Sequence, residues 1–318
     1  MCHDMKVAAV GDLNIDLISQ PLSDFPRKEA STIIDYYVLM VGGCAANFAA
    51  ATATLGLPTR FLGLLGDDAM SDWLVDEMGR HGVEVRVGRR PGMTCGITLA
   101  FAFEDGKRSY LATLGSNGEL SLGDLELGLL DGVDHVHRSG YWWSDHMVGE
   151  PTARVLQHAS EHGAQTSLDI GWDFKGWSRD RVESVFTCLR HTDVFFANRD
   201  EVEKLTGKAD PIDGAKKLLE SGPGMVALHL GKAGSAVVTG NGVTRAEPHD
   251  VEVINPTGTG DVFNASFVYG LVQGWDLQRV VNFAVSSAEV HIQRKDRSFP
   301  TLDKVQSFIS DPGAYQVV

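Results

Sequence analysis

Short apolar runs typical of buried strands alternate along this chain with helical patterns of similar length. The first run, residues 7–10, is followed at once by Gly11 and Asp12, and a small-residue helical pattern covers residues 43–55. Further strand and helix patterns follow in order at 60–65, 71–81, 135–139, 152–162, 165–169, 179–189, 193–197, 201–206, 212–220 and 225–230. Strands that alternate with helices in this way form a mainly parallel sheet covered on both faces. We therefore predict an α/β fold with three layers, α/β/α.

Two segments interrupt this alternation. Residues 31–41 and 94–113 are rich in β-branched and aromatic side chains, and the second contains a hairpin turn at 104–107. Strand pairs inserted between strand–helix units do not easily join a parallel sheet. We expect them to form a small separate sheet, a lid over the carboxyl ends of the main strands. Because no internal repeat or linker is evident, the sequence predicts a single domain, residues 1–318, that includes this lid.

Composition restricts the class of protein. The formal net charge of −14 and the lack of a Lys/Arg-rich run argue against a nucleic-acid partner. No apolar run approaches the roughly 18 residues that a membrane span needs, and residues 1–6 do not resemble a signal peptide. The four cysteines are scattered without metal-binding spacing, which is typical of reduced thiols. We expect a cytoplasmic protein with neither a nucleic acid nor a membrane as partner.

The most specific chemical motif is residues 255–261, Asn-Pro-Thr-Gly-Thr-Gly-Asp, which leads into an amphipathic helical pattern that ends at Gln273. The first N–H groups of a helix have no partner within it, so with the helix dipole they form an anion site. A carboxylate at such a site, Asp261, makes sense if the chemistry also needs a base. This combination predicts phosphoryl transfer. Taken alone, the segment also fits a capped turn in which Asp261 is only the N-cap.

Polar and small residues follow the early strands. Asn14 and Asp16 alternate after the first strand, so in an extended segment they point the same way and could bind a polyol; a solvated turn is the alternative. Gly42 and Gly43 would let a ligand lie against the backbone, with Asn47 as a hydrogen-bonding group. Close packing of a helix on the sheet explains these small residues equally well.

Two other groups of residues each have two interpretations. Trp142 and Trp143 follow the strand at 135–139, where they could stack on a sugar or base, or pack in the core. His158 and His162 have a metal-compatible spacing on one helix face. Because the sequence shows no third ligand near them, we predict a solvated face there.

Together these segments resemble the PfkB family of ribokinase-like kinases, which phosphorylate a hydroxymethyl group of sugars or nucleosides with ATP. The early signature is Gly42 and Gly43 with Asn47, followed by residues 63–68, Gly-Leu-Leu-Gly-Asp-Asp. The late signature is residues 255–261. Two signatures in the family's order extend the resemblance over nearly the whole chain.

The resemblance implies a role for each of these residues. Asp261 would accept the proton of the acceptor hydroxyl, and Glu201 would organise Mg²⁺ through water. The amides that hold the γ-phosphoryl group would be those of Gly258, Thr259 and Gly260. Substrate hydroxyls would bind to Asn14, Asp16, Gly42, Gly43 and Asn47. The ATP site would include Asn198, His229, Gly231, Gly234 and Asn282. By their spacing alone, Asn198 and Glu201 also fit a helix capping box, and residues 230–235 fit a hairpin turn.

The chain departs from the family pattern at several positions. Asn255 stands where the family usually has an Asp that helps to bind a monovalent cation; Asn keeps an oxygen ligand without the charge, so dependence on such a cation is left open. Pro256 and Thr259 are also unusual, and His229 replaces a common Thr. Residues 169–173, Asp-Ile-Gly-Trp-Asp, fall where many relatives have Asp-x-Asn-x-Arg. The missing Arg argues against those members that use it to bind an acidic sugar.

The resemblance therefore implies an ATP- and Mg²⁺-dependent kinase that acts on a primary hydroxyl of a sugar. Two alternatives are a nucleoside kinase of the same fold and a catalytically silent relative that binds a sugar or nucleotide. The chain has no Walker A motif and no Gly-x-Gly-x-x-Gly that opens a helix after a strand, which argues against a P-loop enzyme and a dinucleotide-dependent oxidoreductase. Because many relatives pair through their lids, the resemblance also implies a homodimer.

Overall fold

The computed structural model describes residues 6–25, 27–29, 31–105, 107–254, 256–294 and 298–312. Asn255, for which we considered a cation-binding role, lies outside these residues, as does Gly106 of the expected hairpin turn.

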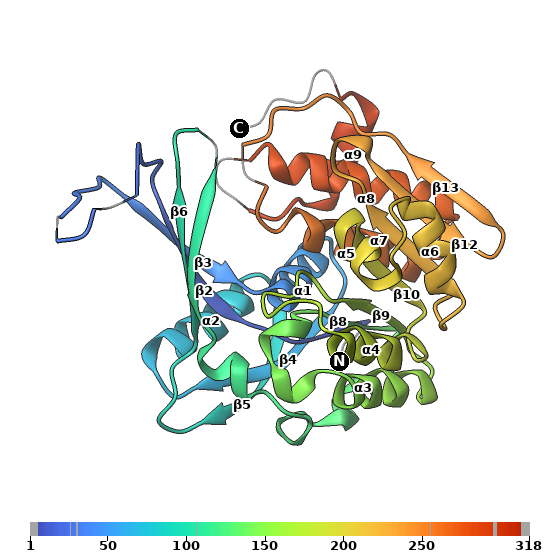
Figure 1. The fold of residues 1–318 in the computed structure, drawn as a ribbon, viewed down its shortest axis with the longest axis horizontal. Helices are drawn as coiled ribbons and strands as arrows, with labels where there is room; N and C mark the ends of the chain where they lie inside the picture. Colours follow the sequence, from blue (N-terminus) through green and yellow to red (C-terminus); the bar gives the residue numbers. More distant parts are fainter. Residues whose placement is uncertain are drawn as a thin grey trace.

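A nine-stranded sheet forms the middle layer, in the order β13-β12-β11-β10-β9-β8-β1-β4-β5 (Figure 1). All strands from β11 to β5 run parallel to their neighbours, whereas β12 and β13 are antiparallel. The predicted mainly parallel sheet is thus confirmed. The strands are β1 (Val7–Val10), β4 (Thr59–Gly66), β5 (Val83–Arg90), β8 (His135–Arg138), β9 (Gln165–Asp169), β10 (Val194–Asn198), β11 (Met225–His229), β12 (Ser235–Thr239) and β13 (Gly242–Ala246).

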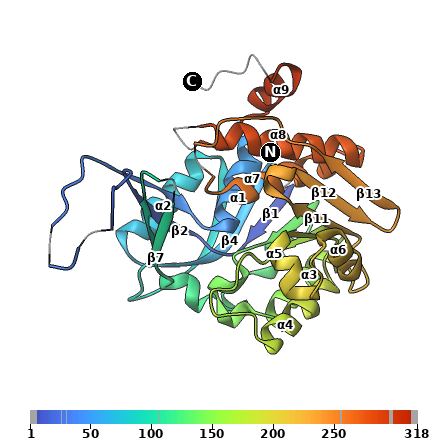
Figure 2. The same cartoon turned by 45° about the horizontal axis from the view of Figure 1, so that its top comes forward.

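Helices cover both faces of this sheet, as predicted (Figure 2). One face carries α1 (Cys44–Thr54), α2 (Ala69–Arg80), α7 (Thr259–Val272), α8 (Leu277–Ile292) and α9 (Leu302–Ser310). The other carries α3 (Glu150–Glu161), α4 (Arg179–Leu189), α5 (Arg199–Thr206) and α6 (Pro211–Leu219). Short 3-10 helices lie at Gly115–Glu119, Leu122–Asp124, Leu127–Leu130, Tyr141–Trp143, Asp145–Met147 and Gly231–Ala233.

Helix α7 differs from its expected amphipathic pattern. Every residue from 261 to 270 is buried, because α1 and α8 pack against α7 and the sheet lies beneath it. The helix also begins at Thr259, so its first turn contains the Thr-Gly-Asp part of the motif.

A separate four-stranded sheet, in the order β3-β2-β6-β7, projects from the main body (Figure 1). It consists of β2 (Asn14–Ser19), β3 (Tyr37–Gly42), β6 (Gly96–Ala102) and β7 (Arg108–Thr113). The expected second sheet is confirmed, but the segment predicted at 31–41 is a strand only from Tyr37 onward. Strand β2 was not predicted, because the polar residues after β1 suggested a loop; its partner across a parallel pairing, β6, lies far along the chain.

The carboxyl ends of the parallel strands share one edge of the main sheet, and the N-termini of α1 and α7 lie there as well. In α/β sheets this edge is where ligands bind. Among the described residues, no helix combines the length and apolar character that crossing a membrane would require.

Candidate active site

The N-terminus of α7 presents backbone donors and a carboxyl group together. Gly258 is the N-cap with φ of 76°, a left-handed conformation that favours glycine. The N–H of Thr259 reaches the carbonyl oxygen of Pro256 at 3.4 Å. Those of Gly260 and Asp261 have no acceptor within the part of the chain that the structure describes. This turn can therefore bind an anion through its free amides.

Asp261 is buried in this turn and is held from another helix, α1. The Nδ2 of Asn47, on α1, donates to the Oδ2 of Asp261 at 2.9 Å. Burial raises the pKa of Asp261 well above its ordinary value, and the negative charges of Asp169 and Asp12 raise it further. A carboxyl group in this setting has a higher proton affinity than an exposed aspartate, which suits a general base.

Asp12 is a site residue that the sequence did not single out. It follows β1, and its carboxylate accepts hydrogen bonds from the N–H groups of Cys44 and Ala45, each at 3.0 Å. It therefore caps α1, the helix that carries Asn47, and so helps to place Asn47 beside Asp261. An Asp after a strand is too common a feature to have revealed this contact.

Gly43 allows α1 to begin against the Asp12 backbone. Its φ is 101°, and a Cβ there would lie 2.6 Å from the Asp12 carbonyl oxygen. We expect Gly43→Ala to lower the free energy of unfolding by about 2 to 4 kcal/mol, because it adds a backbone clash to an unfavourable φ. Urea unfolding measures this loss.

Gly56→Ala is the matched control for Gly43→Ala. Gly56 has nearly the same φ, 99°, but a Cβ there would meet nothing within 4 Å. It should cost only the conformational strain, about 1 kcal/mol. Equal losses at the two positions would show that the close approach to Asp12 is not important.

The polar residues of β2 form a second side of the site. The Nδ2 of Asn14 donates to the Oδ1 of Asp16 at 2.8 Å, so the two side chains do point the same way. Gly42 lies opposite Asn14 on β3, and a Cβ on Gly42 would overlap the Asp16 carboxylate. A small cleft here is lined by Asp16, Met40, Val41, Asn47, Thr257, Gly258, His291 and Phe299. The structure thus brings together Asp16, Asn47 and Gly258, which are far apart in sequence.

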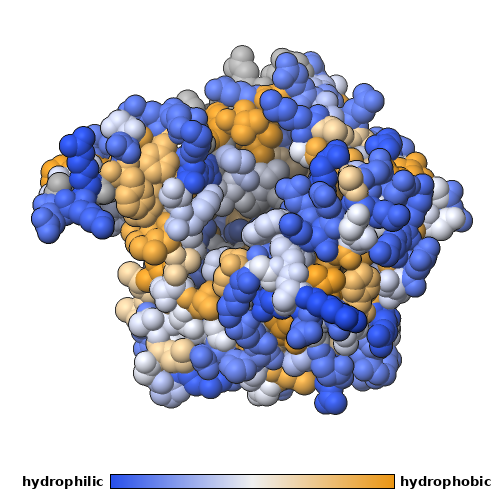
Figure 3. Space-filling view, in the orientation of Figure 1, coloured by the Kyte–Doolittle hydropathy of each residue, from blue (hydrophilic) through white to orange (hydrophobic). Residues whose placement is uncertain are grey.

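A larger cavity of about 870 Å³ lies on the other side of the α7 N-terminus. Figure 3 shows the hollowed face of the molecule between the four-stranded sheet and the main body. Of the residues predicted to bind phosphate or nucleotide, the cavity is lined by Asn198, His229, Gly231, Gly234, Thr259 and Gly260. This volume is within the range of small-molecule sites.

Asn282 is not among the residues that line this cavity. It is exposed on α8, where its Oδ1 accepts a hydrogen bond from Gln278 at 3.0 Å. Val285, one helical turn further along, lines the cavity instead. The cavity is also lined by His249 and Glu289, which are joined through the histidine Nδ1 at 2.8 Å. No motif in the sequence pointed to this pair.

A hydrogen-bonded chain links the strand ends β9 and β11 through α7. The Nδ2 of Asn264 donates to the Oδ2 of Asp169 at 2.6 Å, because a carboxylate can only accept. The Oδ1 of Asn264 therefore accepts from the Nε2 of His229, at 2.9 Å. Burial lowers the pKa of His229 and raises that of Asp169. The neutral ring then has its lone pair at Nδ1, close to Gly260.

Asn198 and Glu201 form the capping box of α5. The Asn198 Oδ1 accepts from the N–H of Glu201 at 3.0 Å, and a Glu201 oxygen accepts from the N–H of Asn198 at 2.9 Å. Burial raises the pKa of Glu201 to about 8, with the charge of Asp169 as the next cause. Glu201 is thus a buried carboxyl group directly behind Asn198, which lines the cavity.

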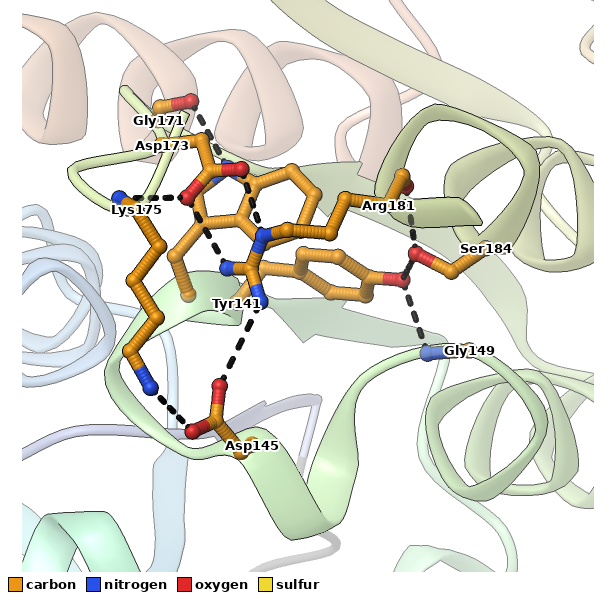
Figure 4. A network of polar contacts seen from close by, with 9 residues as sticks. Tyr141, Asp145, Gly149, Gly171, Asp173, Lys175, Arg181 and Ser184 are labelled. Carbon is orange, nitrogen blue, oxygen red and sulfur yellow. Dashed lines mark hydrogen bonds and ion pairs between the residues drawn. The ribbon is translucent and has the colours of Figure 1, made fainter. Parts of the chain in front are cut away.

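Trp142 packs in the core, which was one of the two interpretations of this residue. It is buried, its Nε1 donates to the carbonyl oxygen of Gly171 at 3.1 Å, and the Arg181 guanidinium lies 4.5 Å from the centre of its ring. Trp143 packs against Phe174, with ring centres 5.4 Å apart. Figure 4 shows the polar contacts that surround Arg181 and join the loops after β8 and β9.

The four-stranded sheet contacts the segment before α7. The Nη1 of Arg108, at the start of β7, donates a hydrogen bond to the hydroxyl group of Thr257. The carbonyl oxygen of Thr257 also accepts from the Nε2 of His291 on α8, at 2.9 Å. The segment that precedes the anion site is therefore held from both the small sheet and the main body.

Comparison with known proteins agrees with this geometry. The sequence model of the pfkB family carbohydrate kinases matches residues 4–304. The chain is 25% identical over 316 residues to a 5-dehydro-2-deoxygluconokinase of Clostridium perfringens, covering 95% of this chain and 92% of that protein. It is 24% identical over 305 residues to an ATP-dependent 6-phosphofructokinase of Thermoanaerobacterium thermosaccharolyticum, with the same coverage. An E. coli structure called Ribokinase II, in complex with ATP and Mg²⁺, superimposes with a TM-score of 0.84 at 20% identity, covering 96% of this chain and 99% of that one.

Proposed function

Because this chain belongs to the pfkB family of carbohydrate kinases, we propose that it transfers the γ-phosphoryl group of ATP to a primary hydroxyl of a sugar. One observation carries the proposal. The N-terminus of α7, with its free amides and Asp261, lies between the cavity of about 870 Å³ and the small cleft that contains Asp16 and Asn47. ATP in the cavity and a sugar beside the cleft would meet at this turn.

Asp261 serves as the general base. As the hydroxyl oxygen of the sugar attacks the γ-phosphorus, its proton passes to the Asp261 carboxylate, and the bond from the phosphorus to ADP breaks. The raised pKa favours this proton transfer. The free amides of Gly260 and Asp261, beside those of Gly258 and Thr259, hold the charge of the transferring group. Water is the competing acceptor, so a lid that excludes it suppresses ATP hydrolysis.

ATP occupies the cavity in this proposal. Gly231 and Gly234 let the protein backbone approach the nucleotide closely. The side chains of Asn198 and His229 would lie beside its phosphates. The E. coli structure that shares this fold contains ATP, which supports the assignment. Asn282 is not among the residues that line the cavity.

Glu201 and Asn198 are the residues that fit Mg²⁺. Oxygen donors suit this ion, which keeps several waters and uses few protein carboxylates, and a buried carboxyl group stands behind Asn198. When bound, Mg²⁺ neutralises charge on the ATP phosphates. Through its hydrogen bonds, Glu201 fixes the orientation of the Asn198 side chain, including the Asn198 Oδ1, at this edge of the cavity.

Glu201→Gln should lower kcat about tenfold or more and raise the Mg²⁺ concentration needed for half-maximal activity. Glutamine also serves in a capping box, so the stability of α5 should be retained. Steady-state kinetics at varied Mg²⁺, with thermal unfolding alongside, measures both. Glu203→Gln, an exposed change on the same helix, is the control and should leave kinetics unchanged. Unchanged Mg²⁺ dependence in Glu201→Gln would remove Glu201 from the metal site.

The acceptor is a neutral polyol rather than a sugar acid or sugar phosphate. The thiol of Cys44 has its pKa raised well above the ordinary value by burial and by four surrounding carboxylates, those of Asp261, Asp12, Asp169 and Asp16. This concentration of negative charge disfavours an anionic acceptor.

The residue at the position where many relatives have an arginine that binds an acidic sugar also supports a neutral acceptor. Asp173 stands there, and its buried carboxylate accepts from the Nε and Nη2 of Arg181 at 2.6 and 2.9 Å (Figure 4). Arg181 also reaches Asp145. The Asp173 carboxylate and the Arg181 guanidinium therefore bind each other and, with Asp145, join two loops of the protein.

A panel of acceptors with Mg²⁺-ATP, scored by ADP release, tests the proposed function. We expect turnover with at least one neutral sugar, and little with sugar acids or sugar phosphates. Preference for a sugar acid would contradict the neutral acceptor, and preference for a nucleoside would favour the alternative kinase class. Absence of ADP release with every acceptor would favour a silent relative.

We propose that residues 1–318 form one kinase domain with the four-stranded sheet as its lid, which the contact from Arg108 to Thr257 supports. Exposed apolar side chains on the edge strands of this sheet support pairing of two copies through the lids; they are Tyr37, Leu39, Tyr110 and Leu111. The free thiols of Cys44, Cys95 and Cys188 support a cytoplasmic location.

A further inference from the structure

Two histidines at the end of α3 meet an aspartate from another segment. His158 and His162 are one turn apart, and Asp131 lies between the helix Leu127–Leu130 and β8. One ligand atom from each of the three side chains can be chosen so that all lie within 4.8 Å of one another. The sequence predicted a solvated face because it showed no third ligand. The face is solvent-exposed, as predicted, but folding brings Asp131 beside the two histidines as a third candidate ligand.

The distances within this cluster fit a metal ion. The Nε2 of His158 lies 2.7 Å from the Oδ1 of Asp131, and the Nε2 of His162 lies 3.9 Å from the same oxygen. Tetrahedral coordination with bonds of about 2.0 to 2.2 Å places neighbouring ligand atoms roughly 3.4 Å apart. The two observed distances lie on either side of that value, so small side-chain shifts would complete the geometry.

The His162 ring is already held as a metal-binding ring should be. Its Nδ1 lies 2.7 Å from the backbone carbonyl oxygen of His158, which can only accept, so the Nδ1 carries a proton. In the neutral ring the lone pair is then on Nε2, the atom nearest Asp131. Histidine ligands are commonly oriented by such a hydrogen bond from the other ring nitrogen.

We propose that Asp131, His158 and His162 bind a divalent transition metal ion of the Zn²⁺, Ni²⁺ or Cu²⁺ type. Imidazole favours these ions, whereas Mg²⁺ prefers oxygen ligands only, so this site is chemically distinct from the Mg²⁺ site proposed with ATP. The side chains of His158, Asp131 and His162 are 24%, 47% and 43% exposed. The ion therefore exchanges readily with solvent, and water completes its coordination.

The site stabilises the fold and takes no part in phosphoryl transfer. It lies at the amino-terminal edge of the sheet, where β8 begins and α3 ends before β9, opposite the edge that carries Asp261. Beneath it, Leu130 and Val133 of one segment pack with Val155 and Ala159 of α3 in one apolar cluster. A metal ion would join these two segments across that cluster.

Calorimetric titration of the untagged full chain with Zn²⁺ tests the site. We expect one ion per chain, with affinity reduced at least tenfold in both His158→Ala and His162→Ala and also reduced in Asp131→Asn. His146→Ala is the matched control, an exposed histidine whose ion-pair partner among the described residues is Glu119, at 3.9 Å. It should bind like wild type. No binding at millimolar Zn²⁺, or equal affinity in all the variants, would overturn the proposal.

Thermal unfolding gives a second measurement that does not depend on kinase activity. Zn²⁺ should raise the unfolding midpoint of the wild type, EDTA should reverse the rise, and Mg²⁺ should not reproduce it. The midpoints without metal show whether each variant is folded. A Zn²⁺-induced rise that persists in the His158 and His162 variants would place the ion elsewhere and refute the site.

Discussion

Asp261→Asn is expected to lower the rate of phosphoryl transfer by at least about a thousandfold while ATP binding is retained. The amide of asparagine cannot accept the proton that the sugar hydroxyl must lose. The variant keeps the shape of the side chain and an oxygen that can accept from Asn47, so the turn at the start of α7 should be preserved. Single-turnover kinetics measures the rate, and calorimetry measures ATP binding.

The same variant should be more stable than the wild type at neutral pH. Burial raises the folded-state pKa of Asp261 well above its unfolded value of about 3.9, so the folded protein loses stability as pH rises between these two values. Asparagine does not ionise and avoids this loss. The gain in free energy of unfolding should be present near pH 8 and vanish below about pH 4, where the carboxyl group is protonated in both states.

Asp303→Asn, an exposed change on α9, is the control for both measurements and should alter neither by much. Near-normal turnover in Asp261→Asn would show that Asp261 is not the base. A variant that is both inactive and less stable at pH 8 would point to a structural role for the carboxylate instead.

Gly260→Ala is expected to reduce kcat by about a hundredfold or more without loss of stability. A Cβ at Gly260 would lie 3.5 Å from the His229 ring, an ordinary contact, so the protein has room for it. Side chains on a helix tilt toward its N-terminus, which places the methyl group in front of the free amides. It would keep the phosphoryl group from these donors, and losing such donors costs about a hundred- to thousandfold in rate.

Gly79→Ala is the matched control, a glycine in α2 whose Cβ would meet nothing within 4 Å. Both changes replace glycine inside a helix, so each should raise the free energy of unfolding slightly. Only Gly260→Ala should affect kcat. Normal kcat in that variant would contradict the assignment of the α7 amides as the anion site.

Much of the fold followed from the sequence because its parallel strands are buried and apolar. β1 is fully buried, and a strand of this kind is recognisable from a short apolar run. β2 was missed because its pairing partners, β3 and β6, come later in the chain and set its extent. The strand predicted at residues 31–41 began too early. Residues 31–36 have a β-branched composition, but composition alone does not supply a neighbouring strand with which to pair.

The site was predictable only in part. Local motifs pointed to the α7 turn and to Asn47, but not to their direct hydrogen bond, which joins residues 214 positions apart. The roles of Asp12 and Asn264 depend on partners from other elements in the same way. Asn282, which the resemblance implied for the ATP site, is exposed on α8, whereas Val285 lines the cavity.

Phosphorus NMR of the wild-type protein with Mg²⁺-ATP and its preferred neutral sugar identifies the product of the reaction. We expect a new phosphomonoester signal, coupled to the hydrogens of a CH₂ group and formed in equal amount with ADP. Inorganic phosphate as the only product beside ADP, or a phosphoryl group on a secondary hydroxyl, would contradict it.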